Sequence, residues 1–244
     1  MNPMKNKRID YKQNAVLPLV LFWSLIPIPS TAQGDFQNLN FEHANPGPLT
    51  QNPIGPPYAY NVPVTNAVPS WSVYYGTVQQ TVINVNASSL GAAAVTLIGP
   101  QDGPLDGNYS VLLQPGGSIN YINASIAQVG TIPTGTETLL FEAWQPMYAL
   151  PFSVSFAGDS LSPVVISSGQ SPSGQDYNVY AAWIGDFAGV NGQLEFTVSG
   201  ENYNSVLLDD ISFSPNAIPE PNTLALVVMG GLALAARRLC KQGL

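Results

Sequence analysis

Short stretches of alternating apolar and polar residues, separated by turn residues, recur through the middle of this chain. The clearest runs are 152–156, 177–183 and 194–198, each with an apolar residue at every second position. Alternation with period two is typical of a β-strand that places one side-chain row on a core. No long run with an apolar period of 3.6 residues appears outside the two ends. The sequence therefore predicts an all-β domain, a sandwich or a barrel.

Further strands are expected between clusters of Gly, Pro, Asn and Asp, which mark turns. Their ranges are 71–75, 79–85, 108–114, 118–123, 137–144 and 205–213. The segment 43–69 differs because it carries seven prolines, and proline lacks the N–H that a central strand must donate. We expect a long surface loop there, either a binding loop or the covering of a sheet edge.

Every Lys and Arg of the chain lies close to one of its two ends. Four stand before residue 13, and the other three are Arg237, Arg238 and Lys241. Between residues 13 and 236 there is neither Lys nor Arg, whereas all but one of the 15 Asp and Glu fall in that stretch. Nucleic-acid binding, phosphate sites built on Arg or Lys, and Schiff-base chemistry are thereby excluded for the middle of the chain. A neutral ligand such as a sugar, a divalent metal ion, or simple solubility outside the cell remains compatible.

The N-terminal residues have the three parts of a secretory signal. A basic stretch is followed by an apolar run from Ala15 to about Ile28, and then by the small residues 30–32. This order predicts a signal peptide over 1–32 that is cleaved after Ala32. The alternative is an uncleaved membrane anchor, which we disfavour because three prolines interrupt the apolar run. The single cysteine, Cys240, lies near the other end, so a domain over 33–217 would contain no disulfide.

The last 27 residues, 218–244, combine a short motif, an apolar run and a basic pair. The motif is Pro219-Glu220-Pro221, the apolar run spans 224–236, and Arg237 and Arg238 follow it. This order resembles the PEP-CTERM sorting signal. The resemblance implies a hydrophobic helix at about 222–239, recognition by an exosortase-type processing enzyme, and delivery to the cell envelope, the outer surface or an extracellular matrix of exopolysaccharide.

The physical properties of this tail agree with such handling. Arg at the end of an apolar helix favours the cytoplasmic side, which leaves the domain before it outside. The apolar run reaches only roughly 20 Å, less than the ~30 Å hydrocarbon core of a bilayer. We therefore expect contact with the membrane through this helix, at least transiently.

Three fragments of the middle domain point to a fold. They are Asn38-Leu39-Asn40-Phe41-Glu42 near its start, Asp106-Gly107-Asn108-Tyr109-Ser110-Val111 between, and Leu207-Leu208-Asp209-Asp210-Ile211-Ser212-Phe213 near its end. An opening and a closing strand of these kinds resemble the galactose-binding-like jelly-roll β-sandwiches, to which many carbohydrate-binding modules belong. The resemblance covers about residues 35–214 and implies a structural calcium near the paired terminal strands.

The closing fragment also raises a question of charge. Strand alternation would put Asp209 on an otherwise apolar row with Leu207, Ile211 and Phe213, and no Lys or Arg exists to pair with it. Either backbone N–H groups satisfy the carboxylate, or a cation does. Calcium takes several oxygen ligands, so Glu42, Asp209 and Asp210 are the candidate residues of a structural calcium site.

Candidate ligand-binding residues are aromatic side chains that could stack on a sugar ring. Trp144 is the first choice because it stands next to an expected loop, and Tyr148 and Trp183 are the others. We expect a non-enzymatic surface or matrix protein, which either binds polysaccharide weakly or serves as structural material. The alternative is a secreted carbohydrate-active enzyme with a carboxylate pair, although no pair of acids has a spacing that signals catalysis.

Overall fold

The computed structural model describes residues 36–47, 60–87, 91–116, 121–145, 152–199 and 204–218. The predicted signal peptide with Ala32 lies outside these residues, as does the tail from Pro219 through Glu220 and Pro221 to Arg237 and Arg238. Both remain predictions. None of the helices in the described part is long and apolar enough to cross a membrane.

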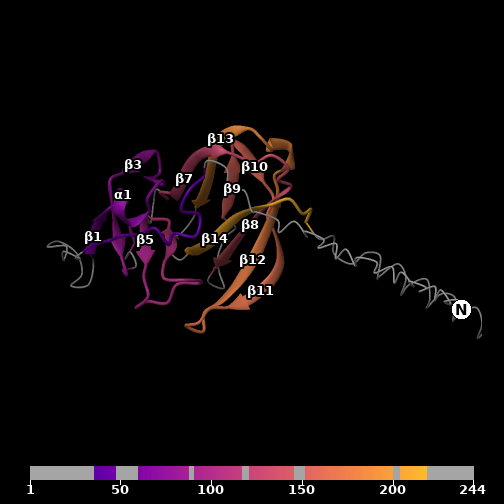
Figure 1. Cartoon of the computed structure of the whole chain (residues 1–244). Helices are drawn as coiled ribbons and strands as arrows, with labels where there is room; N and C mark the ends of the chain where they lie inside the picture. Colours follow the sequence, from indigo (N-terminus) through magenta and orange to yellow (C-terminus); the bar gives the residue numbers. More distant parts are fainter. Residues whose placement is uncertain are drawn as a thin grey trace, which may run out of the picture. The chain divides into compact units, whose positions relative to one another are not determined.

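The described residues form two β-sheets, which confirms the expectation of an all-β domain with sandwich-like sheets (Figure 1). The larger sheet has eight strands in the spatial order β1-β4-β5-β6-β14-β8-β12-β11. Their bounds are Tyr60–Pro63, Val82–Val85, Ala94–Ile98, Ser110–Gln114, Val206–Ser214, Thr138–Trp144, Asp176–Trp183 and Val164–Gln170. Every pairing is antiparallel except that of β4 with β5, which is parallel.

The smaller sheet has six strands in the order β10-β9-β13-β7-β2-β3. Their bounds are Asp159–Leu161, Ser153–Phe156, Asn191–Val198, Ala124–Thr131, Ser72–Tyr75 and Val78–Gln80. The chain crosses between the sheets repeatedly, since β6, β7, β8 and β9 alternate between the larger and the smaller sheet. A short α1 (Val64–Ala67) and a 3-10 turn, η1 (Gly185–Phe187), complete the described elements.

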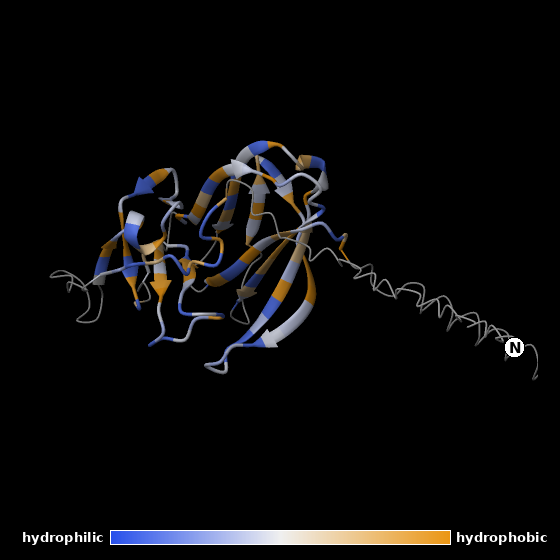
Figure 2. Cartoon of the chain, viewed as in Figure 1, coloured by the Kyte–Doolittle hydropathy of each residue, from blue (hydrophilic) through white to orange (hydrophobic). Residues whose placement is uncertain are grey.

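The core consists of apolar side chains drawn from both sheets, and Figure 2 shows the alternation along the strands that supplies them. Phe141 on β8 is fully buried, stacked on Tyr180 at 5.3 Å between ring centroids. The Phe141 ring also makes edge-to-face contacts with Phe152 and Phe196, at 5.6 and 5.2 Å between ring centroids. Aromatic pairs in this geometry stabilise the core beyond the area that they bury.

Most of the predicted strands are present, with changed ends. The run 79–85 was predicted as one strand, which is wrong: it contains the end of β3 and all of β4, and these belong to different sheets. The chain changes sheet at Thr81, whose carbonyl accepts a hydrogen bond from Val64 N. Of the predicted strand 118–123, Ile122 forms only an isolated bridge with Gly116, and 118–120 lie outside the described residues.

The expected opening strand at Asn38–Glu42 is also wrong, because these residues form consecutive turns. Asn38 and Phe41 have φ of 52° and 58°, a left-handed backbone that no strand adopts. The long surface loop predicted over 43–69 is wrong for its described second half, because 60–67 form β1 and α1, and Val62 and Ala67 are buried in the core. Strand β1 lies at the edge of the larger sheet, as the proline content requires.

Two strands have their side-chain rows placed differently from the prediction. On β12, Ala182 and Tyr180 pack against the main core. Trp183 therefore points away from the core and is 46% exposed. On β14 the register shifts between Asp209 and Ser212, and Asp210 has a φ of 41°. This β-bulge puts Ile211 and Phe213 in the main core but Leu207 in a separate cluster. Asp209 therefore does not share a row with Ile211 and Phe213.

Candidate functional site

Glu42 holds the loop that leads into β6. Its Oε1 accepts hydrogen bonds from Asn108 N at 2.7 Å and Tyr109 N at 2.9 Å, and its Oε2 accepts one from Asn108 Nδ2 at 2.8 Å. Gly107 has a φ of 55°, and a Cβ at this position would collide with Glu42 Oε1. Only glycine fits here without strain, because the loop backbone must approach the carboxylate closely.

Asp209 holds the same loop from the other side. Its Oδ2 accepts hydrogen bonds from Asp106 N at 3.1 Å and Ser110 Oγ at 2.5 Å, and its Oδ1 accepts one from Asp210 N at 2.8 Å. Ile211 N also donates to Leu39 O at 3.1 Å. The three fragments singled out in the sequence therefore meet in space, although they are far apart along the chain.

Asp209 is 1% exposed, and burial raises the pKa of its carboxyl group from 3.8 to about 7. The hydrogen bonds from Ser110, Asp210 N and Asp106 N act in the opposite direction, because they stabilise the ionised form. Desolvation is the larger effect. Of the two ways to satisfy this carboxylate, the structure forms the cage of hydrogen-bond donors.

The calcium hypothesis needs several oxygen ligands that point at one position. The structure instead directs N–H groups at both carboxylates, and Asp210 is exposed. No group of three or more His, Cys, Asp or Glu in the described part of the chain is arranged to hold a metal ion. Glu42 and Asp209 thus already accept hydrogen bonds from N–H groups, and whether calcium binds at Glu42, Asp209 and Asp210 is a question for titration.

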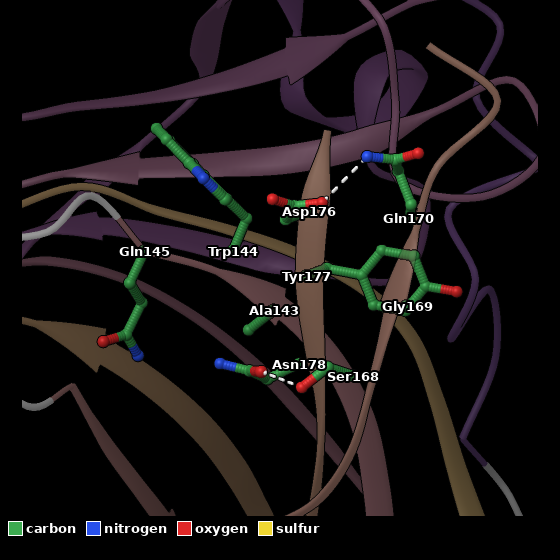
Figure 3. A pocket seen from close by; sticks show the side chains of 9 residues that line it. All are labelled: Ala143, Trp144, Gln145, Ser168, Gly169, Gln170, Asp176, Tyr177 and Asn178. Carbon is green, nitrogen blue, oxygen red and sulfur yellow. Dashed lines mark hydrogen bonds between the residues drawn. The ribbon is translucent and has the colours of Figure 1, made fainter. Parts of the chain in front are cut away.

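A groove of about 730 Å³ lies where β8 ends beside the β11–β12 hairpin (Figure 3). Strand β8 and the residue after it contribute Ala143, Trp144 and Gln145. The hairpin contributes Ser168, Gly169, Gln170, Asp176, Tyr177 and Asn178. This volume is within the range of about 300–1,000 Å³ that is usual for small-molecule sites.

The hairpin wall is held in place by two side-chain hydrogen bonds, both drawn in Figure 3. Gln170 Nε2 donates to Asp176 Oδ1 at 2.9 Å, and Ser168 Oγ donates to Asn178 Oδ1 at 2.7 Å. The Tyr177 ring lies directly over Gly169, where a Cβ would stand 2.6 Å from Tyr177 Cζ. The absence of a side chain at Gly169 therefore lets the tyrosine ring lie flat on the neighbouring strand.

Trp144 and Tyr177 share an apolar cluster on the outer side of the larger sheet. Leu105, which is 1% exposed, fills its centre together with Ile98 and Leu207. Trp144 and Tyr177 pack against this cluster and are half-buried. Each aromatic residue is thus anchored on one side and reaches the groove on the other, which is the arrangement of a stacking platform.

Glu142 connects the groove with the Asp209 cage. Burial raises its pKa, the charges of Asp210 and Asp106 raise it further, and a hydrogen bond with the Tyr177 hydroxyl lowers it. Its Oε2 is buried and has no hydrogen-bond partner among the described residues. Glu142 itself does not line the groove.

Of the residues chosen from the sequence, the structure places only Trp144 in the groove. Trp183 pairs with Thr138, at the opposite end of β8, so about 20 Å of strand separates the two tryptophans. Tyr148 lies outside the described residues. Tyr177 was missed because its strand was expected to turn that row toward the core.

The groove has one carboxylate in its lining, Asp176. A glycosidase needs two carboxyl groups on either side of the scissile bond. Among the described residues that line this groove, there is therefore no carboxylate pair of the kind that a carbohydrate-active enzyme would need.

Comparison with known proteins gives structural similarity only. No family model matches the chain, and no curated protein matches it. Three solved structures are similar at 13–14% sequence identity. They are the module TmCBM61 in complex with β-1,4-galactotriose, the mannan-recognising module TmCBM27, and a cyclase from Fischerella sp. TAU.

The chain's match with TmCBM61 covers 75% of this chain and 99% of that one, at a TM-score of 0.34. The corresponding figures are 64%, 95% and 0.33 for TmCBM27, and 75%, 96% and 0.40 for the cyclase. All three TM-scores are below 0.5.

Proposed function

We propose that this chain is an exported, non-enzymatic protein of the cell surface or extracellular matrix, and that its β-domain, a jelly-roll sandwich, binds a neutral polysaccharide weakly. The observation that carries the proposal is the groove between β8 and the β11–β12 hairpin. It joins two anchored aromatic side chains with amide and hydroxyl groups in a domain that lacks Lys and Arg.

The chemistry of the groove fits a sugar better than other ligand classes. Sugar rings present C–H faces that stack on aromatic side chains, here Trp144 and Tyr177. Their hydroxyls pair with amides and carboxylates, which Gln145, Gln170 and Asp176 supply. A phosphate or carboxylate ligand would find no cation in the described residues to compensate its charge.

The shape of the groove supports weak rather than tight binding. It lies open at the end of a sheet, and its polar groups already bond to one another in the pairs Gln170–Asp176 and Ser168–Asn178. A ligand must replace part of those bonds, which offsets the free energy that it gains. Attachment to a polysaccharide at many sites would compensate through avidity.

A glycan array on the purified protein tests this proposal. We expect binding to at least one neutral polysaccharide, such as a galactan, mannan or glucan, and none to alginate or polygalacturonate. Because the interaction is uncharged, its affinity should be almost independent of salt. Failure to bind every neutral glycan would leave a purely structural role.

We also propose that the tail from Ile218 directs the protein to an exosortase-type enzyme. The support is the order of Pro219-Glu220-Pro221, the apolar run and Arg237-Arg238. The intact mass of protein recovered from the cell surface, compared with 25.9 kDa for the full chain, tests it. Loss of 1–32 together with a C-terminal piece is the expected result, and an uncleaved C-terminus would refute processing.

A further inference from the structure

The four outer strands of the two sheets differ sharply in how well they are protected. An edge strand exposes unpaired backbone N–H and C=O groups, and proteins guard such edges with short strands, prolines, charged side chains or β-bulges. Strands β3 and β10 have three residues each, and β1 has four and ends with Pro63. The remaining edge strand, β11, has seven residues.

Strand β11 has only the last of these protections, a β-bulge between Val165 and Ser167. Its residues, from Val164 to Gln170, include no proline and no charge. Three consecutive apolar side chains are exposed, Val164 at 48%, Val165 at 51% and Ile166 at 37%. Figure 1 shows the strand as the outermost one beside β12.

A β-bulge explains why three apolar residues in a row reach the solvent. Val165 pairs with Tyr180 and Ser167 pairs with Val179, so Ile166 is an extra residue without a partner on β12. The bulge interrupts the alternation that would otherwise turn every second side chain inward. Six of the seven residues of β11 are exposed.

We propose that β11 is a self-association surface: it pairs antiparallel with β11 of a second copy of this chain and joins two eight-stranded sheets across a twofold axis. Pairing about Val165 would place Val164 of each copy opposite Ile166 of the other. Each strand would then satisfy the free backbone groups of its partner and cover the apolar triplet 164–166.

A second copy of the chain can pair with this edge because the edge carries no charge. Two copies of a domain with many acids and neither Lys nor Arg repel each other wherever their carboxylates meet. The stretch 160–175, which contains β11 and both its flanks, has no charged residue, and Asp176 is bonded to Gln170. When β11 pairs antiparallel with β11 of a second copy, no carboxylate of one copy therefore lies opposite a carboxylate of the other. An isologous contact of this kind also needs only one surface.

Sedimentation velocity of the full-length protein over a wide concentration range tests the proposal. We expect a monomer–dimer equilibrium. Val165→Lys and Val165→Asp should each raise the dimer dissociation constant by about tenfold or more, since like charges would face each other across the axis. Because β11 is an edge and Val165 is exposed, both variants should keep the circular dichroism spectrum of the wild type.

The matched control is Val129→Lys, together with Val129→Asp. Val129 is 63% exposed on β7, which lies inside the smaller sheet and not at an edge. These variants should dimerise like the wild type. A monomer at all concentrations would overturn the proposal, as would equal weakening by the substitutions at 165 and 129.

A cross-link gives an independent readout that does not depend on stability. Val165→Cys in a Cys240→Ala background would place the two thiols opposite each other at the twofold axis only if the β11 strands pair. We expect a disulfide-linked dimer on mild oxidation, and none from Val190→Cys, which is exposed outside any strand. Equal cross-linking of the two variants would contradict the proposed pairing.

Discussion

Asp209 should make this domain more stable in mild acid than at neutral pH. The folded state holds the carboxyl at a pKa of about 7, against 3.8 for an ordinary aspartate. In the unfolded chain the group loses its proton near pH 4, whereas in the folded chain it keeps the proton until about pH 7. Between these values the unfolded state binds fewer protons, so the free energy of unfolding falls as the pH rises.

The size of the effect follows from the difference between the two pKa values. A difference of about three pH units corresponds to roughly 4 kcal/mol at about 1.4 kcal/mol per unit. The stabilisation is complete below about pH 4 and is lost by about pH 7. Glu142 and Asp210 also have raised pKa values, which adds to the effect in the same direction.

Urea denaturation followed by tryptophan fluorescence, at intervals from pH 4.5 to 8, measures this dependence. Asp209→Asn should flatten the decline, since an amide does not titrate. Its Oδ1 can still accept from Asp210 N and its Nδ2 can donate to Ser110 Oγ, but the bond from Asp106 N is lost. Asp159→Asn, on an exposed residue of β10, should keep the wild-type slope. A wild-type protein that gains stability from pH 5 to 7.5, or an Asp209→Asn variant with the same slope, would refute this reasoning.

Three further predictions concern the loop, the core and the metal. Gly107→Ala should destabilise the domain by about 1–3 kcal/mol in urea denaturation, because it combines a left-handed φ of 55° with a collision with Glu42; an unchanged stability would mean that this carboxylate does not hold the loop. Phe141→Ala should cost about 3–5 kcal/mol by the same method, since the ring is fully buried among three aromatic neighbours, and a cost below about 1 kcal/mol would contradict the packing described. Calcium should leave the melting temperature unchanged relative to magnesium, because hydrogen-bond donors already satisfy Asp209; a rise that Asp209→Asn abolishes would instead establish a structural ion.

The strands that the sequence predicts well are those with one buried face. Val154 and Phe156 on β9, and Leu194 and Phe196 on β13, alternate with polar residues and are buried as expected. Strand β5 was missed because all five of its residues are buried. The main core covers one of its faces and Leu105 with its cluster covers the other, and periodicity cannot reveal a strand that is buried on both sides.

The errors at the site come from backbone features without a sequence pattern. The bulge at Asp209 and Asp210 moves Ile211 and Phe213 to the core side, and the alternation in the sequence gives no sign of it. On β12, apolar residues occupy both rows, so the choice between the rows depends on which one meets Phe141. Tyr177 became a groove residue for that reason.

What the sequence did predict correctly is the chemistry of the interior charge. The absence of Lys and Arg required that Asp209 be satisfied by donors or by a cation, and the structure provides Ser110 and two backbone N–H groups. The identity of those donors could not be predicted. Asp106 and Ser110 are about a hundred residues away along the chain, and only the pairing of β14 with β6 brings them close.

The most direct test of the proposed function compares two tryptophans of the larger sheet. Calorimetric titration with the neutral polysaccharide identified on the array should show that Trp144→Ala weakens binding by about tenfold or more, the equivalent of about 1.4 kcal/mol. Trp183→Ala removes a more exposed ring at the other end of the same strands, and it should bind like the wild type. If Trp144→Ala folds and binds as well as the wild type, or if Trp183→Ala is the variant that loses binding, the groove is not the polysaccharide site.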